Sequence, residues 1–220
     1  MRRQRTGNVA GATAVAACAV ACAAACLAAC GTATSQAFHP AGDLTAGPGQ
    51  PAVTAPARFP FPADVHFDFT SPLPSDRAQA GAVLADENFQ LAYYYAIYSQ
   101  GSDHRYEAYI GNRLLLGSVQ ETLAKEATAH EGFTGTIVFS ATAVAPAPWA
   151  GELTVSSCVD NSRLLDTDIR TGQVRRGSAP AAHSHFLESD ILARKAGGPW
   201  RVVGTGVTYY PHGQAKECAP

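Results

Sequence analysis

The apolar residues that follow position 75 are spaced as in an amphipathic helix. Pro74 with Ser75 or Asp76 provides a start signal, Gln79 stands where a capping-box partner is expected, and Gly101 provides the stop. At 100° per residue, six side chains fall within one arc of this helix: Ala80, Leu84, Leu91, Tyr94, Tyr95 and Tyr98. The pattern therefore predicts one long helix with a single apolar face.

A second helical region is predicted between Tyr106 and Glu131, as a short helix followed by a longer one. Gly111 separates the two, Asn112 is the expected N-cap of the longer helix, and Gly132 is its expected end. The inner stripe of the longer helix is expected to consist of Leu115, Val119 and Leu123.

From Phe133 onward apolar residues alternate with polar ones, which is typical of β-strands. Two strands are expected around the sequence APAPW, and two more, at residues 183–195 and 200–210, around Gly197-Gly198-Pro199. Residues 161–182 are polar and glycine-bearing, which favours a connection between the two hairpins. Helices followed by four long strands predict an α+β domain over residues 76–220, with the N-terminal helices packed on a curved four-stranded antiparallel sheet.

One carboxylate interrupts the apolar face of the first helix. Glu87 falls in the middle of the arc, between Leu84 and Leu91. If Glu87 faces the core, desolvation raises its pKa and makes it a candidate general base or ligand contact. The alternative is that the helix rolls, or that Glu87 reaches a tyrosine or arginine partner. No second acid at a defined spacing supports acid–base chemistry.

The N-terminus carries the features of an export signal. Arg2, Arg3 and Arg5 precede a run of small and apolar residues that extends to position 29. The sequence Leu27-Ala28-Ala29-Cys30 has the form of a bacterial lipobox, which predicts cleavage of residues 1–29 and lipidation of Cys30. The protein would then be secreted and anchored to the outer face of the cell membrane. A permanent transmembrane helix is the alternative, because about 20 residues span a bilayer.

Residues 30–75 are expected to act as a tether between the lipid anchor and the domain. Eight of the 14 prolines lie between positions 40 and 74, and such a segment buries too little to fold alone. Val65, Phe67 and Phe69 alternate with polar residues, so the end of the tether is expected to pack as an extended lead-in.

Removal of the predicted signal peptide changes the charge and the number of cysteines. Three arginines leave, so 16 Lys and Arg become 13 against 18 acids, a net charge of 13 − 18 = −5, which excludes a basic nucleic-acid-binding surface. Besides Cys30, only Cys158 and Cys218 remain of six cysteines. An even pair in an oxidising compartment is read as one disulfide, with free buried thiols as the alternative.

Several short motifs resemble the nuclear-transport-factor-two-like fold, also called cystatin-like, of secreted actinobacterial lipoproteins. They are the tyrosine-rich first helix, the sequences CVDNS (158–162) and DIRTG (168–172), the Gly-Pro-Trp200 turn and the terminal Cys218. The resemblance implies a cone-shaped domain, a pocket between the first helix and the sheet, and a disulfide joining Cys158 to Cys218. Isomerases, polyketide cyclases and dehydratases also occur on this fold, so the fold alone does not decide function.

No cofactor motif and no metal site are predicted. The chain has no Walker A loop, no dinucleotide fingerprint and no G-x-S-x-G elbow. His183 and His185 share one face of a predicted strand, but a zinc site needs a third ligand, which the sequence does not offer.

Two functions therefore remain as hypotheses. The first is a non-catalytic lipoprotein that binds a small apolar ligand or a cell-surface protein through a pocket lined by Glu87, Leu91, Tyr94 and Tyr95. The second is an acid–base enzyme in which Glu87 is the base and Tyr94 or Tyr95 donates a hydrogen bond. Pairing of two copies through the outer face of the sheet, as a homodimer, is compatible with both.

Overall fold

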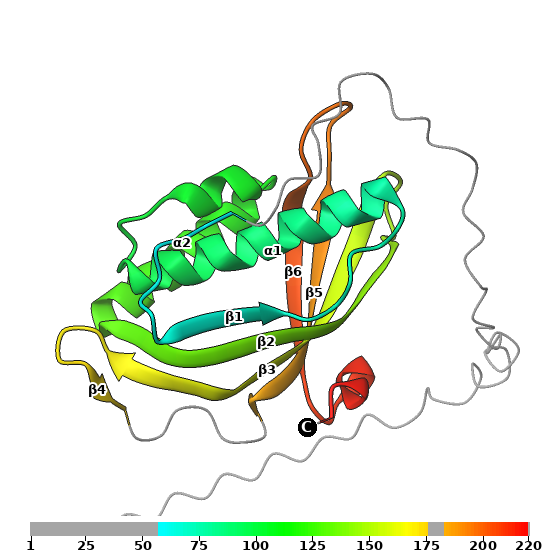
Figure 1. Cartoon of the computed structure of the whole chain (residues 1–220). Helices are drawn as coiled ribbons and strands as arrows, with labels where there is room; N and C mark the ends of the chain where they lie inside the picture. The colour runs from blue at the N-terminus through cyan, green and yellow to red at the C-terminus, as the bar shows by residue number, and fades with distance from the viewer. Residues whose placement is uncertain (1–56, 176–182, 220) are drawn as a thin grey trace, which may run out of the picture. The chain divides into compact units, whose positions relative to one another are not determined.

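The domain combines two α-helices with one curved sheet. The computed structural model describes residues 57–175 and 183–219, and within these residues both helices pack on the same side of a mixed sheet (Figure 1). The predicted α+β class, with helices on a curved sheet, is confirmed. The predicted signal peptide, Cys30 and most of the tether lie outside the described residues.

The first predicted helix is confirmed. Helix α1 comprises Arg77–Tyr98, and the Asp76 side chain accepts a hydrogen bond from the Gln79 amide at 2.8 Å, as expected of an N-cap. After the helix, Gly101 adopts a φ of 75°, and its amide donates to the Ala96 carbonyl. The helix therefore ends through two left-handed residues, Gln100 with a φ of 55° and then Gly101, where glycine is favoured.

The second helical region has the predicted order, but its end differs. A 3₁₀ helix, η1, comprises Arg105–Tyr109, and α2 comprises Arg113–Ala129, with the Asn112 side chain accepting from the Leu114 amide. The left-handed residue that ends α2 is His130, with a φ of 53°, and not Gly132. Gly132 already belongs to the following strand, where a Cβ would approach the Thr167 hydroxyl to 3.0 Å. Glycine there avoids a tight contact within the sheet and has no part in helix termination.

Among the described residues the sheet has six strands instead of the predicted four. They are β1 (Val65–Phe69), β2 (Glu131–Pro146), β3 (Glu152–Asp168), β4 (Gln173–Val174), β5 (His185–Ala193) and β6 (Arg201–Tyr209). Their order is β1-β2-β3-β5-β6, with β4 paired to β3. The two predicted hairpins, β2–β3 and β5–β6, are confirmed as antiparallel pairs.

Two extensions account for the difference in strand number. β1 pairs with β2 in parallel, so the sheet is mixed rather than antiparallel, and the segment expected as a lead-in becomes an edge strand. The reason is packing, because the Phe67 ring lies 5.3 Å from the ring of Tyr94 on α1. β3 continues to Asp168, beyond the point where a polar connection was expected, because Leu164 packs against the core.

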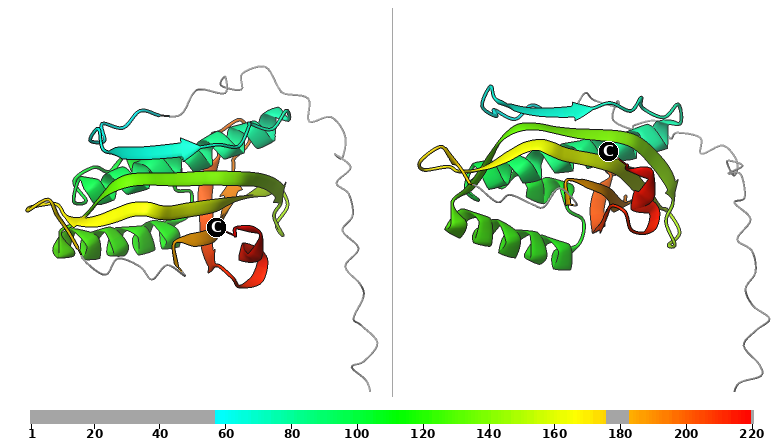
Figure 2. Two further views of the ribbon diagram at one scale, coloured as in Figure 1. Left: turned by 60° about the horizontal axis from the view of Figure 1, so that its bottom comes forward. Right: turned by 90° about the horizontal axis from the view of Figure 1, so that it is seen from below.

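The helices cover the inner face of the sheet, which is the face directed toward α1. One group of buried residues joins Ala82, Ala92 and Ala96 of α1 to Val155, Leu192 and Val202 of the sheet. β2 shifts register at two points, between Thr136 and Val138 and between Ser140 and Ala143, and such irregularities bend strands. Figure 2 shows the resulting curvature of β2 and β3.

A disulfide closes the C-terminal end of the domain. Cys158 of β3 is bonded to Cys218, and their Cα atoms are 5.2 Å apart. The bond holds the 3₁₀ helix η3 (Gly213–Glu217), whose Ala215 is fully buried. Cys158 precedes the inner-facing Val159, so strand alternation directs its side chain to the outer face.

Candidate functional site

Acidic side chains gather where α1 crosses β5. Alternate residues of β5 face α1, so Glu188 and Asp190 lie on the inner face between Phe186 and Leu192. Asp86 and Gln90 are one turn apart on α1, and the Gln90 amide donates to Asp190 at 3.1 Å. We call Asp86, Glu188, Asp190 and Gln90 the acidic site.

Asp86 and Asp190 form a buried carboxyl pair. Asp190 is 1% exposed and Asp86 is 8% exposed. The pKa of Asp86 is raised well above its ordinary value, first by burial and then by the charge of Asp190 and a side-chain hydrogen bond with it. Burial also raises the pKa of Asp190, and the hydrogen bonds that it accepts from its neighbours oppose this rise.

The unpaired oxygens of this carboxyl pair point to a shared proton. The Oδ1 atoms of Asp86 and Asp190 are both buried, and neither has a hydrogen-bond partner in the described part of the chain while both carboxyl groups are ionised. A hydrogen bond between two carboxyl groups exists only when one of them is protonated. The charge of Asp190 raises the pKa of Asp86, which favours the protonated form of Asp86 in this pair.

Glu188 is the accessible member of the acidic site. Burial and the charge of Asp190 raise the pKa of Glu188 to about 8, and hydrogen bonding from the Gln90 amide opposes this rise. The side chain is nevertheless only half-buried and keeps contact with solvent. A proton on Glu188 can therefore exchange with solvent near neutral pH.

Two tyrosines of α1, Tyr93 and Tyr94, lie close enough to Glu188 to interact with its charge. Burial and the charges of Glu126 and Glu188 raise the pKa of Tyr93 to about 12. Burial raises the pKa of Tyr94 further, with contributions from Glu188, Tyr93 and Tyr209. The rings of Tyr93 and Tyr94 meet edge to face with centroids 5.7 Å apart. At neutral pH these tyrosines are un-ionised, so they offer hydroxyl donors and aromatic surface beside a carboxyl group.

The four residues that the sequence grouped in one pocket all lie on α1, but the structure shows no hydrogen bond between Glu87 and either predicted tyrosine in the described residues. Glu87 is 8% exposed, and burial raises its pKa to about 7. Across the described residues, no hydrogen bond joins Glu87 to Tyr94 or Tyr95. Leu91 is buried.

The two predicted tyrosines face different surroundings. Tyr94 reaches toward Glu188, and its ring also packs on Phe67. Tyr95 instead contacts Phe59 and Phe61, and the Arg105 guanidinium lies 5.1 Å from its ring centroid. Of the two, only Tyr94 lies close enough to the acidic site to interact with Glu188.

Sequence reasoning missed Asp86, Gln90, Glu188 and Asp190. A signal was present, because Glu188 and Asp190 stand at alternate positions of a predicted strand, between the apolar residues Phe186 and Leu192. Two acids on the apolar face of one strand repeat the anomaly of Glu87 on the first helix. Whether these acids meet α1 depends on how the helix crosses the sheet, and the periodicity of the sequence does not specify that crossing.

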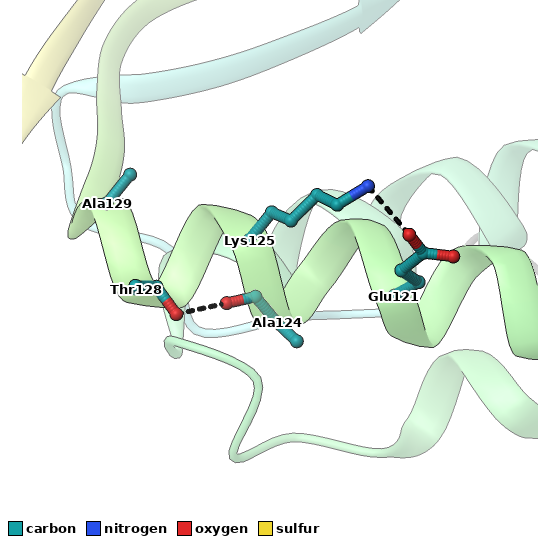
Figure 3. Close-up of a pocket in the computed structure, with 5 residues that line it drawn as sticks. All are labelled: Glu121, Ala124, Lys125, Thr128 and Ala129. Atoms are coloured by element: carbon teal, nitrogen blue, oxygen red, sulfur yellow. Dashed lines mark hydrogen bonds and ion pairs between the residues drawn. The ribbon is translucent and has the colours of Figure 1, made fainter.

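A separate hollow lies on the outer surface of α2. It is lined by Glu121, Ala124, Lys125, Thr128 and Ala129, all of which are solvent-exposed (Figure 3). The Lys125 ammonium binds the Glu121 carboxylate at 2.8 Å, one helical turn away. This hollow is a feature of the helix surface and contains no part of the acidic site.

The two histidines considered as metal ligands have different partners. His185 Nε2 lies 3.3 Å from an Asp160 oxygen, whereas the His183 ring packs 4.7 Å from the ring of Tyr209. Within residues 57–175 and 183–219, no three His, Cys, Asp or Glu side chains gather in a way that could hold a metal ion.

Neither α1 nor α2, nor any other helix in the described ranges, is long and apolar enough to cross a membrane.

Comparisons with known proteins give weak structural similarity. No protein-family model matches the chain, and no curated protein matches it. A structure of Aln2 from a Streptomyces species is 16% identical, covers 63% of this chain and 94% of its own, and gives a TM-score of 0.40. ActVI-ORFA from Streptomyces coelicolor is 19% identical over 60% of this chain and 97% of its own, with a TM-score of 0.39.

A third structure, the intermembrane space region of the chloroplast protein ARC6, is similar at the same level. It is 14% identical and covers 63% of this chain and 99% of its own, with a TM-score of 0.39. Similarities of this size assign neither a family nor an activity to the chain.

Proposed function

We propose that this protein is a lipid-anchored extracytoplasmic protein that binds a small ligand between α1 and the inner face of the sheet. In this proposal residues 1–29 are a signal peptide, Cys30 carries the lipid, and the cone-shaped domain resembles the nuclear-transport-factor-two-like fold. The lipobox sequence supports the anchor. The arrangement of side chains around Glu188 supports ligand binding.

The binding proposal rests on one observation. Side chains on the inner face of the sheet remain in contact with solvent. Glu188 and Tyr94 project between α1 and the sheet, yet both remain only half-buried. On the adjacent strand, Val207 pairs with Glu188 and Tyr209 pairs with Phe186, and residues paired in register share a face. Val207 and Tyr209 are 46% and 43% exposed. Apolar and polar groups thus remain open to a ligand on this face.

Thermal denaturation tests the binding proposal. A ligand that binds only the folded state raises its apparent stability, by about 2.7 kcal/mol at a hundredfold excess over Kd. We expect lipid or cell-wall extracts to raise the melting temperature of the protein. Val207→Trp should reduce that rise because the larger side chain occupies the space beside Glu188.

Val174→Trp provides the matched control for that experiment. Val174 lies on β4 and is 51% exposed, so the same change adds the same bulk away from the inner face. This variant should respond to the extract like the native protein. If the extract raises the melting temperature of Val207→Trp as much as that of the native protein, binding at this face is contradicted.

Mass spectrometry of the membrane fraction tests the anchor. Acylation should be found on Cys30 at the mature N-terminus, and Cys30→Ser should release the protein from the membrane. A native chain that retains residues 1–29 would contradict this part of the proposal and would leave the binding experiment unaffected.

Acid–base catalysis is the second candidate function. The observation that favours it is the presence of carboxyl groups that titrate near neutral pH, with a pKa of about 7 for Glu87 and about 8 for Glu188. Glu188 is the better placed of the two, because it faces solvent and Tyr94. A ligand converted to a new mass by the native protein, but left unconverted by Tyr94→Phe, would support catalysis.

A further inference from the structure

The surface around Glu188 combines aromatic rings with acidic groups from several elements. α1 contributes Tyr93 and Tyr94, and β6 contributes Tyr209, whose ring meets Phe186 of β5 edge to face at 5.7 Å. Tyr209 is also covered on one side by the His183 ring. The result is an aromatic border around a half-buried carboxyl group.

The charged side chains that act on this surface are mainly acidic. The side chains whose charges raise the pKa values of Tyr93, Tyr94, Glu188 and Asp86 are acidic residues or tyrosines: Glu87, Tyr93, Glu126, Glu188, Asp190 and Tyr209. Of the cationic side chains in the described ranges, Arg175 opposes the rise in the pKa of Glu126, and the His183 ring packs on Tyr209. Glu188 itself interacts mainly with the Asp190 carboxyl group and the Gln90 amide, neither of which carries a positive charge.

An unpaired buried atom lies on the same face. Asp190 is two residues from Glu188 on β5 and is 1% exposed. No hydrogen-bond donor reaches its Oδ1 atom in the described structure while Asp86 is ionised. A proton from Asp86 satisfies that atom only while Asp86 remains protonated. The Oδ1 atom of Asp190 therefore loses its hydrogen-bond donor when Asp86 ionises.

We infer that the ligand bound beside Glu188 is a small organic cation with an ammonium group on an apolar body. Aromatic ring faces and a partly desolvated carboxylate are the groups that attract such cations, by cation–π and ionic interactions. The apolar body would contact Val207 and Tyr209, while the ammonium group approaches Glu188. This inference rests on the proposed function, because it names the class of ligand for the same face.

The inference also specifies a pH dependence. The pKa of Glu188 in the free protein is about 8, so the carboxyl group is mostly protonated at pH 7. A cation binds the ionised form and releases the proton. Affinity should therefore rise by about tenfold per pH unit below pH 8 and level off above it. The groups that interact with Glu188 are Asp86, Gln90, Tyr93 and Tyr94 of α1 and Asp190 of its own strand.

Two ligands of the same shape and different charge provide the test. Choline and its uncharged carbon analogue dimethylbutanol are titrated into the whole protein by calorimetry, together with tetramethylammonium, butylammonium and spermidine. We expect at least one ammonium ion to bind, with the stated rise in affinity toward pH 8. If choline is that ion, dimethylbutanol should bind at least about tenfold more weakly. Equal binding of choline and dimethylbutanol would overturn the inference without any variant.

Two matched substitutions locate the binding site. Glu188→Gln keeps the shape of the side chain but removes the ionisable group, so it should weaken binding about tenfold or more and abolish the rise with pH. Glu152→Gln makes the same change on the outer face of β3, where Leu153 is the inward neighbour, and should leave binding unchanged. An unchanged affinity in Glu188→Gln would overturn the inference.

The outcomes separate this inference from the function on which it rests. If extracts stabilise the protein through the inner face but none of the four ammonium ions binds, the cationic ligand class is wrong and the binding function stands. If neither extracts nor ammonium ions bind, both are wrong.

Discussion

At the scale of single residues, the carboxyl pair of Asp86 and Asp190 makes stability depend on pH. Both groups bind protons more tightly in the folded state, because burial raises their pKa values above the unfolded value near 3.8. The folded state then holds more protons, so the free energy of unfolding falls as pH rises above about 4. The limiting slope is about 1.4 kcal/mol per pH unit for each proton.

Asp86→Asn removes this dependence while retaining a hydrogen-bond donor for Asp190. We expect the variant to be more stable than the native protein at pH 8 and to lose that advantage at pH 5, as measured by urea denaturation. Asp68→Asn is the control, because Asp68 is exposed on β1 and should show no such difference. A variant that loses more stability at pH 8 than at pH 5 would contradict the shared proton.

At the scale of secondary structure, local patterns predicted the elements whose ends are encoded in the chain itself. Asp76 and Asn112 cap α1 and α2 as expected, and the alternation after Phe133 gave both hairpins. Local sequence patterns did not predict the features that depend on contacts between residues far apart in the chain. β1 forms because Phe67 meets Tyr94, and the acidic site forms because Gln90 meets Asp190, a hundred positions away. Neither contact produces a repeating pattern in the nearby sequence.

The same reasoning predicts that a chain beginning at residue 76 is unstable. That start matches the sequence-based boundary but removes β1, whose Val65 is buried and whose Phe69 ring stacks 4.8 Å from Phe139. Losing these contacts should lower the free energy of unfolding by on the order of 3–5 kcal/mol relative to a chain beginning at residue 57. Urea midpoints of the two chains measure this. Equal midpoints would show that β1 is only an extended lead-in.

At the scale of the whole domain, the disulfide joins the centre of the sheet to the end of the chain. β3 pairs with both β2 and β5, and it bears Cys158, whereas Cys218 follows η3. The bond therefore fixes a terminal segment to the strand that connects the two hairpins. Export to an oxidising compartment, which the lipobox predicts, is the condition under which such a bond persists.

Removing that bond tests how much the domain depends on it. The 60-residue separation implies a stabilisation of roughly 4 kcal/mol in the chain-entropy model, since a longer closed loop restricts the unfolded chain more. Cys158→Ala with Cys218→Ala should lower the free energy of unfolding by about that amount, as measured by urea denaturation under non-reducing conditions. The native protein under reducing conditions should reproduce most of the loss. A loss below about 1 kcal/mol in both experiments would contradict the chain-entropy expectation, because a bond that restricts the unfolded chain stabilises the domain whatever the folded contacts are.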